Sequence, residues 1–222
     1  MASVNLKQLK KLWAESCKTL WIEIAALRYL ENDLRGRYAE IGSSVILTDL
    51  VYAPECKGRI NDSTKDEVLA RIDHYITHAV TLRVVLLSAC FETYFSEFLI
   101  AYLAHRSKYF VGGVRTPLGN KVYGEVMKVR GLRHRVEAFC KSTNAKIASI
   151  EPRLLLLEEV CLLRNAIVHD GGICDDYSAT KIVSIKVVAG QPISISSSEL
   201  VRILAPPCIQ IAEDLDAKIH PK

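Results

Sequence analysis

The feature that most constrains the fold is a long run of residues with helical periodicity, which ends near Arg106. Asp62 or Ser63 is expected to cap its first turn, because a short polar side chain there can accept a backbone hydrogen bond. Between Val84 and Leu103 the run is apolar on nearly every face. A helix of that kind must be surrounded by other elements. The sequence therefore predicts a helical bundle with this segment as its central helix.

The chain as a whole is predicted to be all-α, a bundle of four or five helices with one small two-stranded β-hairpin before the last helix. A single domain is expected over residues 1–222. It has a long N-terminal helix in 1–41, a loop over 42–63 and the core bundle over 64–218. Apolar residues that recur at steps of three and four predict the helices.

Within the core, a third helix is expected over 121–141, and a fourth begins at Pro152, a residue that suits the first helical turn. The stretches "KIVSIKVV" and "PISIS" alternate β-branched and polar residues around "AGQ", which predicts the hairpin at about 180–196. Ser197 or Ser198 is expected to cap the last helix. The Pro206–Pro207 pair is expected to kink or split that helix.

Composition indicates a soluble, intracellular protein of moderate charge. The net charge of +4 permits an anionic partner without demanding one. Seven cysteines are spread widely with no CxxC pair, so neither a disulfide framework nor a zinc site is indicated. The N-terminus is too polar for a signal peptide, and the most apolar run, bounded by Arg83 and Glu92, is short of a membrane span. We therefore expect a cytoplasmic location and no membrane partner.

The fourth helix ends in "LLRNAIVHDGG", which places Arg164, Asn165 and His169 in the last turns of a core helix. Asn165 and His169 are four residues apart and share a face, whereas Arg164 lies roughly 140° from His169 on an ideal helix. The two could meet through the reach of the arginine, through a distorted last turn, or by facing a second copy of the protein. The glycines that follow predict a left-handed helix end.

Two interpretations of this stretch compete. In one, the residues are ordinary for a helix end, where Arg and His interact favourably with unpaired carbonyls. In the other, they form a site that handles phosphate, because the last turn favours a protonated imidazole and histidine can transfer protons near neutral pH.

The pattern Arg-Asn-x-x-x-His at the end of a helix resembles the signature of the HEPN superfamily, an arginine followed four to six residues later by a histidine. The central helix, with "VVLLSACFETYFSEFLI", is similar to the second core helix of HEPN proteins, where a "SxFExY" string is typical. The end of the motif, followed by a hairpin and a last helix, resembles the branch associated with Ribo-L-PSP domains. The resemblance spans about residues 64–218.

The resemblance implies a bundle that dimerises and a metal-independent endoribonuclease that needs no cofactor. His169 would be the general acid or base, and Arg164 would neutralise charge on the phosphate. Asn165 would orient the scissile phosphate or His169. The setting implied is a toxin, an antiphage protein or a stress-defence protein, with an antitoxin or another defence protein as a possible partner. Where one toxin branch carries a modifiable tyrosine, this chain has Gly171, which argues against that form of regulation.

Other residues extend the hypothesis. Arg130, Arg133 and Arg135 belong to the densest basic cluster, which either tracks an RNA backbone or is a solvated face. Glu92 lies in the apolar helix and needs a partner, for which Arg164 or a backbone donor is expected. His74 and His78 could supply half of a metal site, but the sequence offers no convincing third ligand.

Two other functions remain open. The chain could be a catalytically silent HEPN module that dimerises or binds a partner. It could also be a helical regulator that binds nucleic acid without cutting it.

Overall fold

The structure is a computed structural model that describes residues 3–42, 45, 63–147 and 150–219. The predicted loop over 42–63 lies almost wholly outside the described residues. The described chain is all-α with one small hairpin, as predicted. It divides into two compact units, residues 17–80 and residues 1–16 together with 81–222.

The two longest helices run through both units. Helix α1 spans Val4–Arg35 and α3 spans Lys65–Ala104. At the start of α3, the Thr64 hydroxyl accepts a hydrogen bond from the Glu67 backbone N–H, and the Glu67 carboxylate accepts one from the Thr64 N–H. This reciprocal arrangement is a capping box. The cap that the described residues form is therefore Thr64, one residue after the predicted Ser63.

The unit of residues 17–80 has its own small core, made by Leu34, Val68 and Ile72. The ammonium group of Lys65 is buried there and donates to the backbone carbonyls of Tyr38 and Ile41, at 3.1 and 2.6 Å. These bonds tie the start of α3 to the turn that follows the end of α1.

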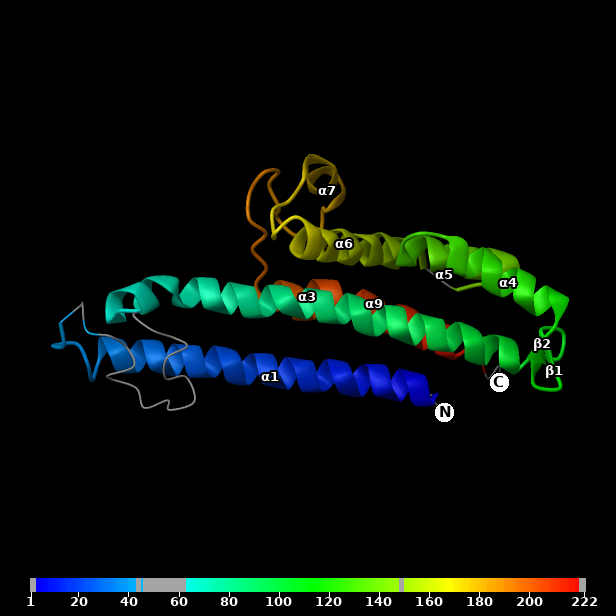
Figure 1. The fold of residues 1–222 in the computed structure, drawn as a ribbon, viewed down its shortest axis with the longest axis horizontal. Coiled ribbons are helices and arrows are strands. Elements are labelled where there is room, and N and C mark those ends of the chain that lie inside the picture. Colours follow the sequence, from blue (N-terminus) through cyan, green and yellow to red (C-terminus); the bar gives the residue numbers. More distant parts are fainter. Residues whose placement is uncertain (1–2, 43–44, 46–62, 148–149, 220–222) are drawn as a thin grey trace. The chain divides into compact units, whose positions relative to one another are not determined.

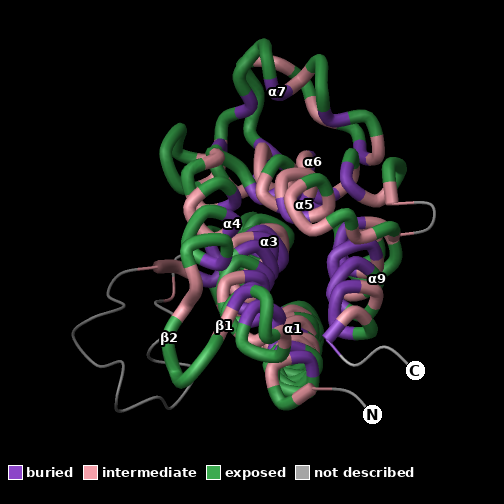
Figure 2. The backbone as a smooth tube through the Cα atoms, turned by 90° about the vertical axis from the view of Figure 1, so that its right-hand side faces the viewer, coloured by how far each residue is buried: buried purple, intermediate pink, exposed green. Residues whose placement is uncertain are grey.

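The second unit contains the remaining elements. These are β1 (Phe110–Val111), β2 (Val114–Arg115), α4 (Pro117–Lys128), α5 (Leu132–Thr143), α6 (Ile150–His169), α7 (Asp176–Lys181), α8 (Ser197–Glu199), the π-helical turn η2 (Leu200–Leu204) and α9 (Ala205–Asp216). Helix α6 packs against α5 and α9. Buried positions gather on α3 and α9, while α7 is mostly exposed (Figure 2).

The α3 segment after residue 80 is the core helix of this unit, as the sequence predicts. Phe91, Phe95 and Phe98 are completely buried, and Phe95 and Phe98 pack edge-on against Phe139 of α5. A stripe that includes Leu82, Leu86 and Ile100 is 40–55% exposed. Helix α3 has a window long and apolar enough to cross a membrane by length and composition, and 44% of that window is buried inside the protein.

Two sequence predictions of local structure are wrong. The helix predicted over 121–141 is two helices, α4 and α5, because Gly131 adopts φ +84° and breaks the helical path. The small hairpin lies at 110–115 rather than 180–196. Its strands join through Gly112–Gly113, both with positive φ, the conformation that tight hairpin turns require.

The segment after α7 forms no hairpin because its polar backbone groups find other partners. The Ser184 N–H donates to the Glu159 carboxylate of α6. The second half pairs with the chain just after α6, where the Ile193 N–H donates to the Gly172 carbonyl at 2.8 Å. Four isoleucines of this segment are buried, but only the last two have the spacing of two that a strand gives. They are Ile182, Ile185, Ile193 and Ile195.

The last helix is split near the prolines, as predicted. Ser196 rather than Ser197 caps α8, in a capping box with Glu199. The π-helical turn η2 then leads into α9, whose first turn holds Pro206, where a missing N–H costs nothing.

Candidate functional site

The site is built on the end of α6. His169 is the last residue of the helix and is exposed. Gly171 and Gly172 follow with φ of +62° and +82°, and the Gly172 N–H donates to the Ala166 carbonyl at 3.0 Å. This is the left-handed glycine cap that the sequence predicts. It ends the helix abruptly and leaves the imidazole at an open edge.

Arg164 reaches His169 within a single chain. Its Nη1 lies 2.9 Å from the Asn165 Oδ1 and 3.4 Å from the His169 Nε2. The helix remains regular to His169. Of the three ways in which these side chains could meet, the structure uses the reach of the arginine.

The contact with Arg164 engages one imidazole nitrogen, Nε2. Because a guanidinium only donates hydrogen bonds, this contact is a hydrogen bond when His169 is neutral with its ring proton on Nδ1. The Nε2 lone pair is then occupied by Arg164, and it can take a proton from a nearby hydroxyl once the guanidinium turns from the imidazole to an anion. The Asn165 Oδ1 accepts a hydrogen bond from the same guanidinium nitrogen.

Arg164 forms no ion pair with a carboxylate among the described residues. Its side chain is half-buried, while Asn165 and His169 are exposed. A guanidinium without a carboxylate partner keeps its full charge available for an anion, and its planar shape suits phosphate. The three predicted catalytic residues are therefore brought together, accessible and carry one unneutralised positive charge.

A pocket of about 180 Å³ adjoins Arg164. It is lined by Ser88, Glu92, Gly131, Leu132, Arg135, Cys161, Arg164 and Asn165. Glu92 accepts a hydrogen bond from Arg135 Nη1 at 2.9 Å, so the expectation that Arg164 or a backbone donor is its partner is wrong. Tertiary structure explains this choice of partner, because the break at Gly131 starts a new helix, α5, that places Arg135 beside α3.

Four residues that line the pocket were not singled out by the sequence, and two of them, Ser88 and Cys161, have a side chain with a hydroxyl or a thiol. Each lies four residues before a candidate site residue on the same helix, Ser88 before Glu92 and Cys161 before Asn165. That spacing is the signal that could have found them. Burial raises the pKa of the Cys161 thiol to about 11. Cys161 is therefore a neutral thiol at physiological pH rather than a nucleophile.

The predicted RNA-binding arginines differ in their surroundings. Arg133 pairs with three carboxylates, those of Glu137, Glu151 and Glu158. Hydrogen bonds with Glu137 and Glu158 raise the pKa of Arg133. Arg135 is paired with Glu92, and Arg130 is exposed.

The described residues contain no group of three His, Cys, Asp or Glu side chains that could hold a metal ion. The rings of His74 and His78 stack with their centroids 6.5 Å apart, in the unit of residues 17–80.

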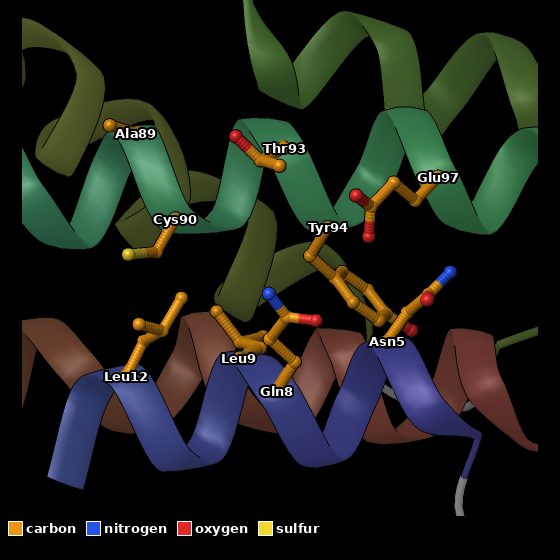
Figure 3. A pocket seen from close by; sticks show the side chains of 9 residues that line it. All are labelled: Asn5, Gln8, Leu9, Leu12, Ala89, Cys90, Thr93, Tyr94 and Glu97. Carbon is orange, nitrogen blue, oxygen red and sulfur yellow. The ribbon is translucent and has the colours of Figure 1, made fainter.

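A second pocket, of about 160 Å³, lies between the start of α1 and α3 (Figure 3). Leu9 and Leu12 face it from α1, and Cys90, Thr93 and Tyr94 from α3. The Tyr94 hydroxyl donates to the Ala212 carbonyl of α9 at 2.6 Å, and burial raises its pKa. None of the candidate site residues lines this pocket. The Tyr94 hydrogen bond joins α3 to α9 beside this pocket.

No family model, curated protein or solved structure matches the chain. The chemistry available to Arg164, Asn165 and His169 is therefore the basis on which a function is assigned.

Proposed function

We propose that the protein is a metal-independent endoribonuclease of the HEPN type, acting in the cytoplasm in toxin, antiphage or stress defence. The observation that supports this most is the 3.4 Å contact between Arg164 and His169 on an exposed helix end, with no carboxylate on the arginine. A cationic fork beside an imidazole supplies two groups that phosphodiester cleavage without a metal uses, a positive charge for the phosphate and a proton acceptor for the attacking hydroxyl.

In this mechanism, His169 Nε2 takes the proton of a ribose 2′-hydroxyl. The 2′-oxygen attacks the adjacent phosphorus, the bond from phosphorus to the 5′-oxygen breaks, and a cyclic phosphate forms. The imidazolium formed in the first step, or water, supplies the proton to the leaving 5′-oxygen. Arg164 neutralises the negative charge that grows on the phosphate oxygens. Asn165 positions Arg164 through the hydrogen bond to its Oδ1.

A homodimer is part of this proposal. The Arg–His contact is complete within one chain, so a second copy is required only to close the site over RNA. The 47% exposed side chain of Val168, next to His169, supplies apolar surface for such a contact. Light scattering after size-exclusion chromatography measures the mass, and a strict monomer at micromolar concentration would argue against the dimer.

The test of the activity is incubation of the purified protein with mixed RNA in the presence of EDTA. The parent is expected to cut, and His169→Ala to lose about 10²–10⁴-fold in rate. Arg202→Gln is a matched control, because Arg202 is an exposed arginine of the same unit outside the site. Cleavage that persists undiminished in His169→Ala would reject the site. Absence of cleavage by the parent at all protein concentrations and on all RNAs would favour the silent module.

A further inference from the structure

The pocket beside Arg164 has the positive charge of an anion-binding site, and one of its two arginines is already paired with a carboxylate. Two guanidinium groups, of Arg135 and Arg164, line it together with the Asn165 amide and a single carboxylate, Glu92. The ion pair between Arg135 and Glu92 neutralises one of the two positive charges. One positive charge remains, and it belongs to the arginine that also contacts His169.

The two partners of that ion pair are held differently. Arg135 Nε donates to the Val129 carbonyl at 3.1 Å, so its guanidinium is anchored to the backbone at a second point. Its side chain is only 20% exposed, whereas that of Glu92 is 50% exposed. The Glu92 carboxylate accepts no other hydrogen bond from the part of the chain that the structure describes, and water can solvate it at little cost. Glu92 is therefore the partner that an incoming anion can replace.

The volume of the pocket limits what can enter. At about 180 Å³ it is smaller than the roughly 300–1,000 Å³ of sites that hold drug-sized ligands. A single phosphate group fits the size, the two guanidiniums and the amide donor. A second phosphate is always present near a scissile one, because the RNA backbone carries one at every nucleotide.

We propose that this pocket binds the RNA phosphate next to the scissile one, with Arg135 as its ligand and Glu92 as the anion that occupies Arg135 until RNA replaces it. Arg164 lies between the pocket and His169 and contacts both phosphates. The identity of the ligand rests on the proposed function, whereas the competition between Glu92 and a phosphate rests on the geometry alone.

The proposal predicts effects of opposite sign for the two halves of one ion pair. Arg135→Gln removes the ligand and should weaken RNA binding about tenfold. It should also reduce the slope of log Kd against log salt concentration by about 0.7, the value for one phosphate contact on a single strand. Glu92→Gln removes the competing anion and should tighten binding several-fold. A general loss of structure would weaken binding in both.

The probe is a fluorescent 2′-O-methyl oligonucleotide, which has the phosphates of RNA but no 2′-hydroxyl to attack and so cannot be cut. Fluorescence anisotropy gives the dissociation constant of each variant at several salt concentrations. Arg202→Gln serves as the control for loss of one positive charge, and thermal unfolding checks that each variant is folded. If Arg135→Gln does not fold, Glu92→Gln still tests the proposal, because tighter binding of the probe supports it and unchanged or weaker binding overturns it.

The outcomes separate this proposal from the ribonuclease assignment. Opposite effects in a protein that never cuts RNA would support the pocket and reject the enzyme. Cleavage by the parent with unchanged binding in both variants would support the enzyme and overturn the pocket. Weaker binding in both variants would show that the ion pair is structural and would also overturn the pocket. A parent that does not bind the probe overturns it as well.

Discussion

Two arginines near α6, Arg133 and Arg164, show how the same side chain can serve opposite purposes. Arg133 extends from α5 and meets Glu151 in the first turn of α6 and Glu158 near its middle, with Glu137 from its own helix. Arg164 lies near the other end of α6 and meets an amide and an imidazole. The first guanidinium has more negative charge around it than it can neutralise, and the second has none within ion-pair distance among the described residues.

The difference teaches which arginine is available for a ligand. Carboxylates already satisfy Arg133, so an RNA phosphate would have to displace them, and its contribution is to hold α5 against α6. Arg164 is held in place by neutral groups that leave its charge intact. A cluster of basic residues in the sequence therefore says little about RNA binding until the carboxylates around each residue are known.

The largest expected effect separates the two arginines by activity. Arg164→Gln should lower kcat/KM for RNA about 10²–10³-fold, because the charge that stabilises the transition state is lost. Arg133→Gln should leave kcat/KM within a few-fold of the parent. Single-turnover cleavage of a fluorogenic RNA in EDTA measures both. Equal losses of kcat/KM in the two variants would show that Arg164 is no more important for cleavage than Arg133.

The next effect concerns Cys161, which lines the pocket with Arg164. An arginine charge alone would activate a thiol, but burial dominates and raises the pKa to about 11. At pH 7.5 its alkylation by iodoacetamide should be on the order of 100-fold slower than that of free cysteine, since only the thiolate reacts. The rate should rise with pH toward 11. Mass spectrometry of the labelled peptide measures this rate, and labelling as fast as free cysteine would show that burial does not control the thiol.

A smaller effect is expected on stability. Arg133→Gln should lower the free energy of unfolding by about 1–2 kcal/mol, because it leaves partly buried carboxylates without their charged donor. Arg130→Gln is the matched control, since Arg130 is exposed on the segment just before α5 and should change stability very little. Urea unfolding followed by circular dichroism gives both values. An unchanged midpoint for Arg133→Gln would mean that its three ion pairs contribute nothing.

The smallest effect is a pH dependence within the Arg133 cluster. Burial by itself would raise the pKa of Glu137, but hydrogen bonds with His134 and Arg133 together lower it below its ordinary 4.5. A carboxylate whose pKa is lowered on folding stabilises the protein above its ordinary pKa, and this contribution is lost as pH falls through the folded value. Glu137→Gln should therefore cost a few tenths of a kcal/mol at pH 6. As the pH falls below 4.5 that difference should shrink and finally disappear, and a constant difference would exclude the ionised pair as its cause.

Much of this molecule was predictable because it depends on residues close together in the sequence. Periodicity identified α3 as a core helix, and two consecutive glycines identified the end of α6. The hairpin was misplaced although its own signal, a Gly-Gly turn between β-branched residues at 111–114, was present. The β-branched stretches after α7 looked like strands, but such a pattern reports only which side chains suit a half-buried surface. It does not report which backbone will be the hydrogen-bonding partner.

The candidate site also has a part that neighbouring residues determine and a part that packing between helices determines. The sequence by itself determined that Arg164, Asn165 and His169 lie in the last turns of one helix, because i, i+1 and i+5 positions follow from helical geometry. Only the tertiary structure decided which charges are neutralised. Glu92 of α3 meets Arg135 of α5 rather than Arg164, and Arg133 of α5 meets two carboxylates of α6 in addition to Glu137 of its own helix. Neighbouring residues determine where a helix begins and ends and which side chains share its last turns. The choice of ion-pair partner depends on how helices far apart in the chain pack together.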